Sequence, residues 1–362
     1  MNNYFNVYNL ALNSDYLRIM DQISNQVLFI ALSSFFALIL SILATKFYIS
    51  IAHKYKLLSV PHQGGVRKDI VPTSGGISFG LIYIAFIVGL SYISEIPNTY
   101  FYSITFGSGA MLIMGFIDDI YGLSSGIRLV LQFLFVLFVS YLFGVDEIID
   151  GTFEYLLLLP IIIFGSIWII NTFNFIDGAD GLVSTNSSIF AFIGGVFLLI
   201  NNETILALLL FILSTLNLGF LVYNWSPAKV FMGDSGSLFL GSIFVIFGIG
   251  AFTQDTITFW IWLILLSIFY IETTVTLLIR IKRKENALKV HHSHHAYQQI
   301  IISSGKHNRP AILSIILHFI WIIPMAILAY NYPEKGWFIT LIACLPLLFL
   351  FYFFGPYRTK DI

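Results

Sequence analysis

Residues 27–52 read VLFIALSSFFALILSILATKFYISIA, an apolar run whose one charged residue is Lys46. A helix needs about 20 apolar residues to cross a bilayer core, so this run predicts a membrane span. The whole chain is similar, because 58% of its 362 residues are hydrophobic and 10% are charged, whereas soluble proteins are about 25% charged. This composition excludes a water-soluble enzyme. A net charge of −1 with few basic residues excludes a disordered or nucleic-acid-binding protein.

Further apolar stretches predict an all-α, polytopic membrane protein with about eleven transmembrane helices. A single domain is expected over residues 1–362. The first 26 residues are polar and lack a basic segment ahead of an apolar one, so they do not resemble a cleavable signal peptide. The predicted spans are 27–52, 75–94, 100–117, 127–145, 155–170, 187–200, 204–223, 237–253, 257–279, 311–330 and 336–354.

The basic residues predict the orientation of these spans. With eleven spans, alternate connections fall on opposite sides of the membrane. Of the 18 Lys and Arg residues, all except Arg18 and Lys335 then fall on one side. Cytoplasmic loops carry the excess of Lys and Arg, so the N-terminus is expected outside and the C-terminus in the cytoplasm.

The connections on this basic side also hold dense polar segments. Each has a plain structural explanation: a solvated helix end, a polar turn, a helix N-cap, or a zinc or lipid contact. Together, however, five carboxylates and several cations on one membrane face favour a divalent metal and a phosphorylated substrate. The segments are Asp118-Asp119, residues 171–182 with Asn174, Asp177 and Asp180, Asp234 in a Gly-Asp-Ser-Gly-Ser turn, and four histidines between 291 and 295.

Glu272 is an acid inside a predicted span. Acids at such depth are functional candidates. We expect this one to pair with Arg280 or with a neighbouring span.

Between about residues 61 and 298 the motifs occur in a fixed order. They are Gly75-Gly76, Asp118-Asp119, Asn171-x-x-Asn174-x-x-Asp177-Gly-x-Asp180-Gly-Leu182, Phe231-x-Gly-Asp234-x-Gly-Ser237 and a His motif that includes His295. By this ordered set the chain resembles the polyprenyl-phosphate N-acetylhexosamine-1-phosphate transferases (glycosyltransferase family 4), which include the phospho-MurNAc-pentapeptide translocase. Eleven spans match the expectation for the enzymes that initiate O-antigen and teichoic-acid synthesis.

The resemblance implies a Mg²⁺-dependent reaction, with Mn²⁺ as a substitute. Undecaprenyl phosphate would attack a UDP-linked N-acetylated sugar and give undecaprenyl-diphospho-sugar and UMP, the first membrane step of O-antigen or other cell-surface glycan synthesis. It also implies the bacterial cytoplasmic membrane as the location, with the active site on the cytoplasmic face. Membrane lipids and a second copy of the chain in a homodimer are the other expected partners, and nucleic acid is not one.

The resemblance also assigns roles to residues. Asp234 would be the principal metal ligand, supported by Asp119, and Phe231 would stack on uracil. Whether an aspartate acts as a base stays open, because a phosphate is largely dianionic at pH 7. The expected catalytic residues are Asp118, Asp119, His292 and His295, and the expected substrate-binding residues are Lys68, Thr73, Arg128, Asn174, Asp177, Asp180, Asn224 and Phe231.

Two departures from the family pattern bear on the substrate. Residues 62–68 read HQGGVRK where many relatives have an Arg-Lys/Ser-x-His run, and Gly122 stands where the peptidoglycan enzyme has a lysine. The sequence His295-Ala296-Tyr297-Gln298 resembles the subgroup that starts O-antigen chains. We therefore expect a UDP-linked 2-acetamido-2,6-dideoxyhexose or UDP-N-acetylglucosamine as donor. The deoxy sugar is slightly favoured, because its C6 methyl would suit packing against Tyr297 better than a hydroxyl.

Three alternatives remain at this stage. The first is the same reaction with MurNAc-pentapeptide, and the second is a non-catalytic scaffold of the same fold. The third is a membrane transporter, which would need polar groups deep within its spans, where Glu272 and His318 are the main candidates.

Overall fold

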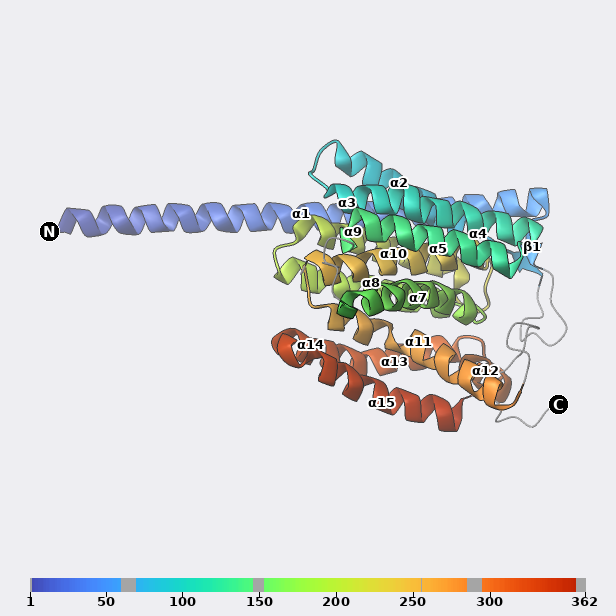
Figure 1. Cartoon of the computed structure of the whole chain (residues 1–362). Helices are drawn as coiled ribbons and strands as arrows, with labels where there is room; N and C mark the ends of the chain where they lie inside the picture. The colour runs from blue at the N-terminus through green and yellow to red at the C-terminus, as the bar shows by residue number, and fades with distance from the viewer. Residues whose placement is uncertain (1, 60–69, 146–152, 255, 285–294, 356–362) are drawn as a thin grey trace.

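The computed structural model describes residues 2–59, 70–145, 153–254, 256–284 and 295–355, which form a bundle of long helices lying side by side (Figure 1). Two π-helical turns, η1 and η2, interrupt otherwise continuous spans. The elements are α1 (Asn2–Tyr55), β1 (Leu58–Ser59), β2 (Val71–Pro72), α2 (Gly76–Ser91), α3 (Asn98–Tyr102), η1 (Ser103–Ser108), α4 (Gly109–Tyr121), α5 (Ser125–Leu142), α7 (Phe153–Ile176), α8 (Leu182–Ile200), α9 (Thr204–Asn224), α10 (Gly233–Gln254), α11 (Phe259–Lys282), α12 (Ala296–Ser304), α13 (Arg309–Leu317), η2 (His318–Ile322), α14 (Ile323–Asn331), η3 (Pro333–Lys335) and α15 (Gly336–Phe354).

The predicted polytopic, helical fold is confirmed. Every apolar stretch expected to span the membrane is helical, and 10 helices in the described part of the chain are long and apolar enough to cross. The remaining stretch, 75–94, forms α2, which has 16 residues. At 1.5 Å per residue α2 is about 24 Å long, which is less than a bilayer core of about 30 Å.

The first helix continues well beyond its predicted span. α1 has 54 residues, and its N-terminal part extends away from the bundle (Figure 1). Inside the bundle α1 lies along α9, where the Ser41 hydroxyl donates to the Leu216 carbonyl at 2.6 Å. Beyond Tyr55 the chain forms a small antiparallel ladder that pairs Leu58 with Pro72. This ladder joins the residues just after α1 to those just before α2.

α10 is the central helix. Of its most apolar stretch 83% is buried, against 11% for α1. Small residues allow this position because they let neighbouring backbones approach closely. A Cβ on Gly241 would lie 2.9 Å from Ile170 Cα on α7, and one on Gly250 would lie 2.0 Å from the Tyr100 hydroxyl on α3.

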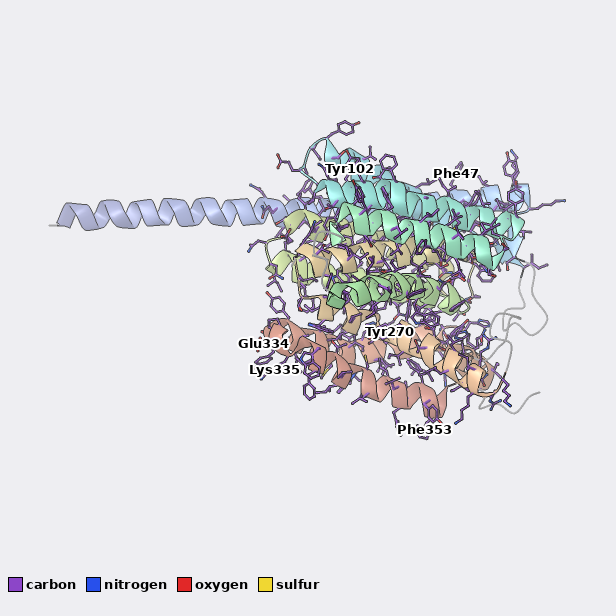
Figure 2. All side chains as sticks on the ribbon, in the orientation of Figure 1. Phe47, Tyr102, Tyr270, Glu334, Lys335 and Phe353 are labelled. Carbon is purple, nitrogen blue, oxygen red and sulfur yellow. The ribbon has the colours of Figure 1, made fainter. Side chains whose placement is uncertain are left out.

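The periphery of the bundle is apolar. Figure 2 shows Phe47, Tyr102 and Phe353 on its outer sides, and all three side chains are exposed. An exposed apolar surface of this extent fits contact with lipid, which the composition already predicts. Glu334 and Lys335, by contrast, lie together beside the end of α14 (Figure 2).

Candidate active site

Two of the predicted motifs meet through their main chains. The Gly75 N–H donates to the Phe231 carbonyl at 2.9 Å, and the Gly76 N–H donates to the Met232 carbonyl at 2.9 Å. A Cβ on Gly76 would lie only 2.1 Å from Gly236 Cα, so the start of α2 packs directly on the start of α10. The Gly-Gly motif is therefore required by this close approach of two backbones.

Asp119, at the end of α4, caps the N-terminus of α10. Its two carboxylate oxygens accept the Asp234 N–H at 2.9 Å and the Ser235 N–H at 3.2 Å. The first N–H groups of a helix lack partners within the helix and favour negative charge. Gly115 permits the approach, because a Cβ there would lie 2.3 Å from the Asp234 carbonyl oxygen. Gly233, at φ +72°, completes the tight turn into α10.

Arg128 joins the other two carboxylates. Its Nη1 lies 3.1 Å from Asp118 Oδ2 and 3.3 Å from Asp234 Oδ2. Asp118 also accepts the Leu123 N–H at 2.6 Å, which fixes the turn between α4 and α5. The Asp118 side chain is 6% exposed and that of Asp234 is 29% exposed, so Asp234 is the more accessible partner.

Asn174, near the end of α7, completes this arrangement. Its Nδ2 donates to Asp234 Oδ1 at 2.7 Å and lies 3.3 Å from the Ser237 hydroxyl. Three residues later in the chain, Asp177 accepts the Gly233 N–H at 3.1 Å. The structure thus brings side chains from α4, α5 and α7 to one point at the start of α10.

The loop after α7 is fastened to the segment before α10 by two further predicted residues. Asp180 accepts the Ala228 N–H at 3.3 Å. Asn224 accepts the Gly181 N–H and the Ser184 hydroxyl, and donates to the Val230 carbonyl at 2.9 Å. Both side chains are buried and bind protein groups. Their contact with a substrate stays a prediction.

The side chains of Asp118, Asp119, Arg128, Asn174 and Asp234 form a cluster at the start of α10. Its oxygen atoms are the kind of ligand that Mg²⁺ prefers, although they do not surround an ion completely. Among the described residues, no group of three His, Cys, Asp or Glu side chains lies close enough to hold a metal ion unaided. Mg²⁺ is commonly bound by one or two carboxylates, with water and substrate phosphates filling its other positions. The hard oxygen atoms of Asp118, Asp119 and Asp234 fit that mode, with Arg128 as a cation that contacts the first and the last of them.

His295 immediately precedes α12, and it contacts Glu272, a pairing that the sequence did not predict. Its Nδ1 lies 3.0 Å from Glu272 Oε2 on α11. Glu272 Oε1 also accepts the Ala296 N–H at 2.6 Å. We expected Glu272 to pair with Arg280 or with a neighbouring span. In the structure it contacts His295 and Ala296 instead, at the start of α12. Residues 23 positions apart carry no local pattern that would have identified this pair.

Sequence reasoning also missed an amide pair beneath the cluster. Gln132 lies one helical turn after Arg128, and Asn171 one turn before Asn174. The Asn171 amide donates to Gln132 Oε1 at 2.7 Å. The i+4 and i−3 spacings place these two residues on the same helix faces as the residues above them, and this signal was present in the sequence.

The other predicted residues of the described chain are buried or contact protein groups. Phe231 is 4% exposed, and the Thr73 carbonyl accepts the Tyr48 hydroxyl at 2.6 Å. Tyr297 donates its hydroxyl to the Phe175 carbonyl at 3.1 Å and is buried, which gives no support to packing on a sugar. Lys68 and His292 lie outside the described residues.

Comparisons with known proteins identify the family of the chain. Residues 101–252 match glycosyl transferase family 4. A probable undecaprenyl-phosphate N-acetylglucosaminyl 1-phosphate transferase of Bacillus subtilis is 30% identical over 281 residues, which cover 74% of this chain and 75% of that protein. The chain belongs to glycosyl transferase family 4.

Other members of family 4 are similar to the chain. A phospho-N-acetylmuramoyl-pentapeptide-transferase of Borreliella burgdorferi is 28% identical over 317 residues, covering 75% of this chain and 87% of that protein. One of Staphylococcus aureus is 30% identical over 207 residues, covering 50% and 63%. Membership of family 4 makes the protein a membrane-bound transferase and sets aside the transporter.

The stretch matched to family 4 includes the cluster. It runs from α3 to α10 and contains the polar side chains that meet at the start of α10, namely those of Asp118, Asp119, Arg128, Asn174, Asp177, Asp234 and Ser237. Gly75-Gly76 and His295 lie outside the matched stretch. The main-chain bonds of Gly75 and Gly76 nevertheless tie that motif to the matched stretch.

Proposed function

We propose that the protein transfers an N-acetylhexosamine 1-phosphate from a UDP-sugar to undecaprenyl phosphate and releases UMP. One observation carries the proposal. Asp234 stands at the N-terminus of α10 and is joined through Arg128 to Asp118. Helix N-termini favour phosphate groups, and carboxylates beside a guanidinium suit a site that handles a metal and a pyrophosphate together. Both kinds of relative carry the name of a sugar-phosphate transferase.

The transfer needs few groups that move protons. A phosphate oxygen of undecaprenyl phosphate attacks the sugar-linked phosphorus of the UDP-sugar and forms a new P–O bond. The bond from that phosphorus to the bridging oxygen breaks, and UMP leaves with the bridging oxygen and its electron pair. Phosphoryl transfer depends mostly on positioning and electrostatics, and the attacking phosphate is largely dianionic at pH 7. The protein's main task is therefore to orient two anions that repel each other.

The residues of the cluster divide this task. Asp234 would hold Mg²⁺, supported by Asp118, which shares the Arg128 contact with it. Bound there, Mg²⁺ would supply charge neutralisation for the pyrophosphate. Both carboxylate oxygens of Asp119 already accept main-chain N–H groups of α10. We therefore propose that its main role is to position Asp234, and that binding the metal is a secondary role. Arg128, whose side chain is 33% exposed, would contact phosphate oxygens.

For the donor sugar we favour N-acetylglucosamine. The Bacillus subtilis relative, which matches three quarters of its own length, carries that sugar in its name. The preference for a 6-deoxy sugar depended on Tyr297, and that ring is buried against the protein. The use of MurNAc-pentapeptide is the second candidate, because two relatives are named for it.

The place of the reaction follows from the charge asymmetry of the sequence. We propose that the cluster lies on the cytoplasmic face of a bacterial membrane, where UDP-sugars are made, and that the resulting lipid enters O-antigen or another surface glycan. A homodimer remains a prediction from the resemblance.

Purified protein tests the proposal directly. It is mixed in detergent with Mg²⁺ and undecaprenyl phosphate, and UMP release is measured with UDP-N-acetylglucosamine, a UDP-2-acetamido-2,6-dideoxyhexose or UDP-MurNAc-pentapeptide. We expect UMP release with the first donor that depends on undecaprenyl phosphate, and none from the Asp234→Asn variant. Turnover of the pentapeptide donor alone would replace the proposed sugar. No UMP with any donor would refute the reaction.

A further inference from the structure

Glu272 is a buried acid on α11 whose hydrogen bonds, among the described residues, go to the start of α12. Its side chain is 4% exposed. It lies within a helix that is apolar enough to cross the membrane, where a carboxylate is costly unless it is paired. Its oxygens contact His295 Nδ1 at 3.0 Å and 3.3 Å and accept the Ala296 N–H at 2.6 Å. One carboxylate thus secures both the ring of His295 and the first N–H of α12.

The start of α12 is in turn joined to the candidate active site. The Tyr297 ring stacks beside His295 at 5.5 Å between ring centroids, and its hydroxyl donates to the Phe175 carbonyl at 3.1 Å. A Cβ on Gly178 would lie 2.0 Å from that hydroxyl. Gly178 directly follows Asp177, which binds the Gly233 N–H. A continuous chain of contacts therefore runs from Glu272 to the residues around Asp234.

The pairing also determines where His295 carries its proton. An ionised carboxylate only accepts hydrogen bonds, so the ring nitrogen that faces it must be the donor. Here that nitrogen is Nδ1. In the described part of the chain the ring makes its hydrogen bonds through Nδ1, and its side chain is 16% exposed. Nε2 is the nitrogen that remains for a ligand.

We propose that Glu272 is a positioning residue, which holds His295 with Nδ1 protonated so that Nε2 is presented to a phosphate oxygen of the substrate. The inference rests on the proposed function, in which His295 belongs to the active site. With an accepting carboxylate at Nδ1 and an accepting phosphate at Nε2, both ring nitrogens must donate hydrogen bonds, which only the doubly protonated ring can do. The Nε2–H bond to phosphate then joins a cation to an anion, whereas a neutral ring would offer the same phosphate an uncharged donor.

Glu272→Gln separates this role from mere packing. Glutamine has nearly the same shape, and its carbonyl oxygen can keep the Ala296 N–H. Its amide N–H₂ then faces Nδ1, which must become an acceptor, and the proton moves to Nε2. The ring becomes neutral while the start of α12 stays capped. We expect kcat to fall at least about tenfold, because the neutral ring loses its Coulomb attraction to the phosphate, with KM for the UDP-sugar changed less.

Two variants serve as comparisons. Thr274→Val on the same helix removes a hydrogen bond from Trp168 Nε1, 3.0 Å long, that does not involve His295, so its kcat should stay within twofold of the unchanged protein. Glu272→Asp restores a group that only accepts hydrogen bonds. It should recover part of the kcat lost in Glu272→Gln.

The ¹⁵N chemical shifts of the His295 ring report its protonation and would not change if Glu272 only filled space. They are measured in full-length protein labelled at histidine, and the signals are assigned with the His295→Gln variant. We expect a protonated Nδ1 in the unchanged protein and in Glu272→Asp, and an unprotonated Nδ1 in Glu272→Gln. The same Nδ1 signal in all three, or a kcat for Glu272→Gln within twofold of the unchanged protein, overturns the inference. If Glu272→Gln does not fold, a folded Glu272→Asp with an unprotonated Nδ1 overturns it.

The two proposals fail differently. If the unchanged protein releases no UMP with any donor, the proposed function is wrong, and the chemical shift still decides whether Glu272 sets the protonation of His295.

Discussion

Replacing Asp119 by asparagine tests the idea that α4 positions the start of α10. Asp119 accepts two main-chain N–H groups, from Asp234 and Ser235, one on each carboxylate oxygen. Asparagine has one carbonyl oxygen and can accept only one of them. Its N–H₂ group would then point at the other N–H, and the negative charge that faces the helix N-terminus would be gone.

The size of the effect follows from these contacts. A hydrogen bond to a charged group contributes about 1.5–3 kcal/mol, and an unpaired N–H costs about 1–3 kcal/mol. Because the loop can relax, we expect a net loss of about 2–3 kcal/mol, which for a chain of this length corresponds to a fall of roughly 4 °C in Tm. Asp234 follows the helix start, and a displacement of about 1 Å at a reacting centre can reduce kcat about 100-fold.

The assay combines thermal unfolding in detergent with UMP release. Glu334→Gln is the matched control, because this exposed acid in η3 lies beside the end of α14 (Figure 2) and contacts none of the cluster in the described chain. The control should keep both Tm and kcat. An Asp119→Asn protein with unchanged Tm and kcat would refute the view that Asp119 holds α10 in place.

Three further outcomes are expected. Asp234→Asn should lower kcat more than 100-fold, as one lost charge-stabilising group can, while Tm changes little, and excess EDTA should abolish activity; full turnover in EDTA contradicts the metal assignment. Gly76→Ala should lower Tm and UMP release, because its Cβ would lie 2.1 Å from Gly236 Cα. Gly89→Ala in the same helix meets nothing within 4 Å and should keep both values, so equal behaviour of the two variants would contradict the close approach. A cysteine at position 150 should react with an impermeant thiol reagent in intact cells and one at position 286 only after lysis, and the reverse result would invert the predicted orientation.

The spans could be predicted from sequence because crossing a bilayer is a local property of about 20 residues. The break at the π-helical turns η1 and η2 could not, since an extra residue in a helical turn leaves no hydropathy signal. The length of α1 was also missed. Residues 2–24 continue the helix, although their polarity separates them from the apolar run.

The site residues could be proposed by type but not placed. Adjacent aspartates at 118 and 119 suggest a shared task, yet they face different partners: Arg128 for the first and the amides of α10 for the second. Adjacent residues on a helix point about 100° apart, so a division of roles was foreseeable. The partners were not, because they depend on how α4 packs on α10. The pairing of Glu272 with His295 has the same origin in tertiary packing.

The hydrogen bond between Asp119 and the Asp234 N–H joins residues that are 115 positions apart. The two partners are therefore synthesised at different times. At roughly 5–20 residues per second, Asp119 leaves the ribosome between about 6 and 23 s before the amide that it will cap. Throughout that interval α5, α7, α8 and α9 of the described chain are made while the carboxylate has no α10 to bind. The site therefore cannot assemble before residue 234 has been made, and a ribosome that stalls earlier leaves a protein that is embedded in the membrane and inert.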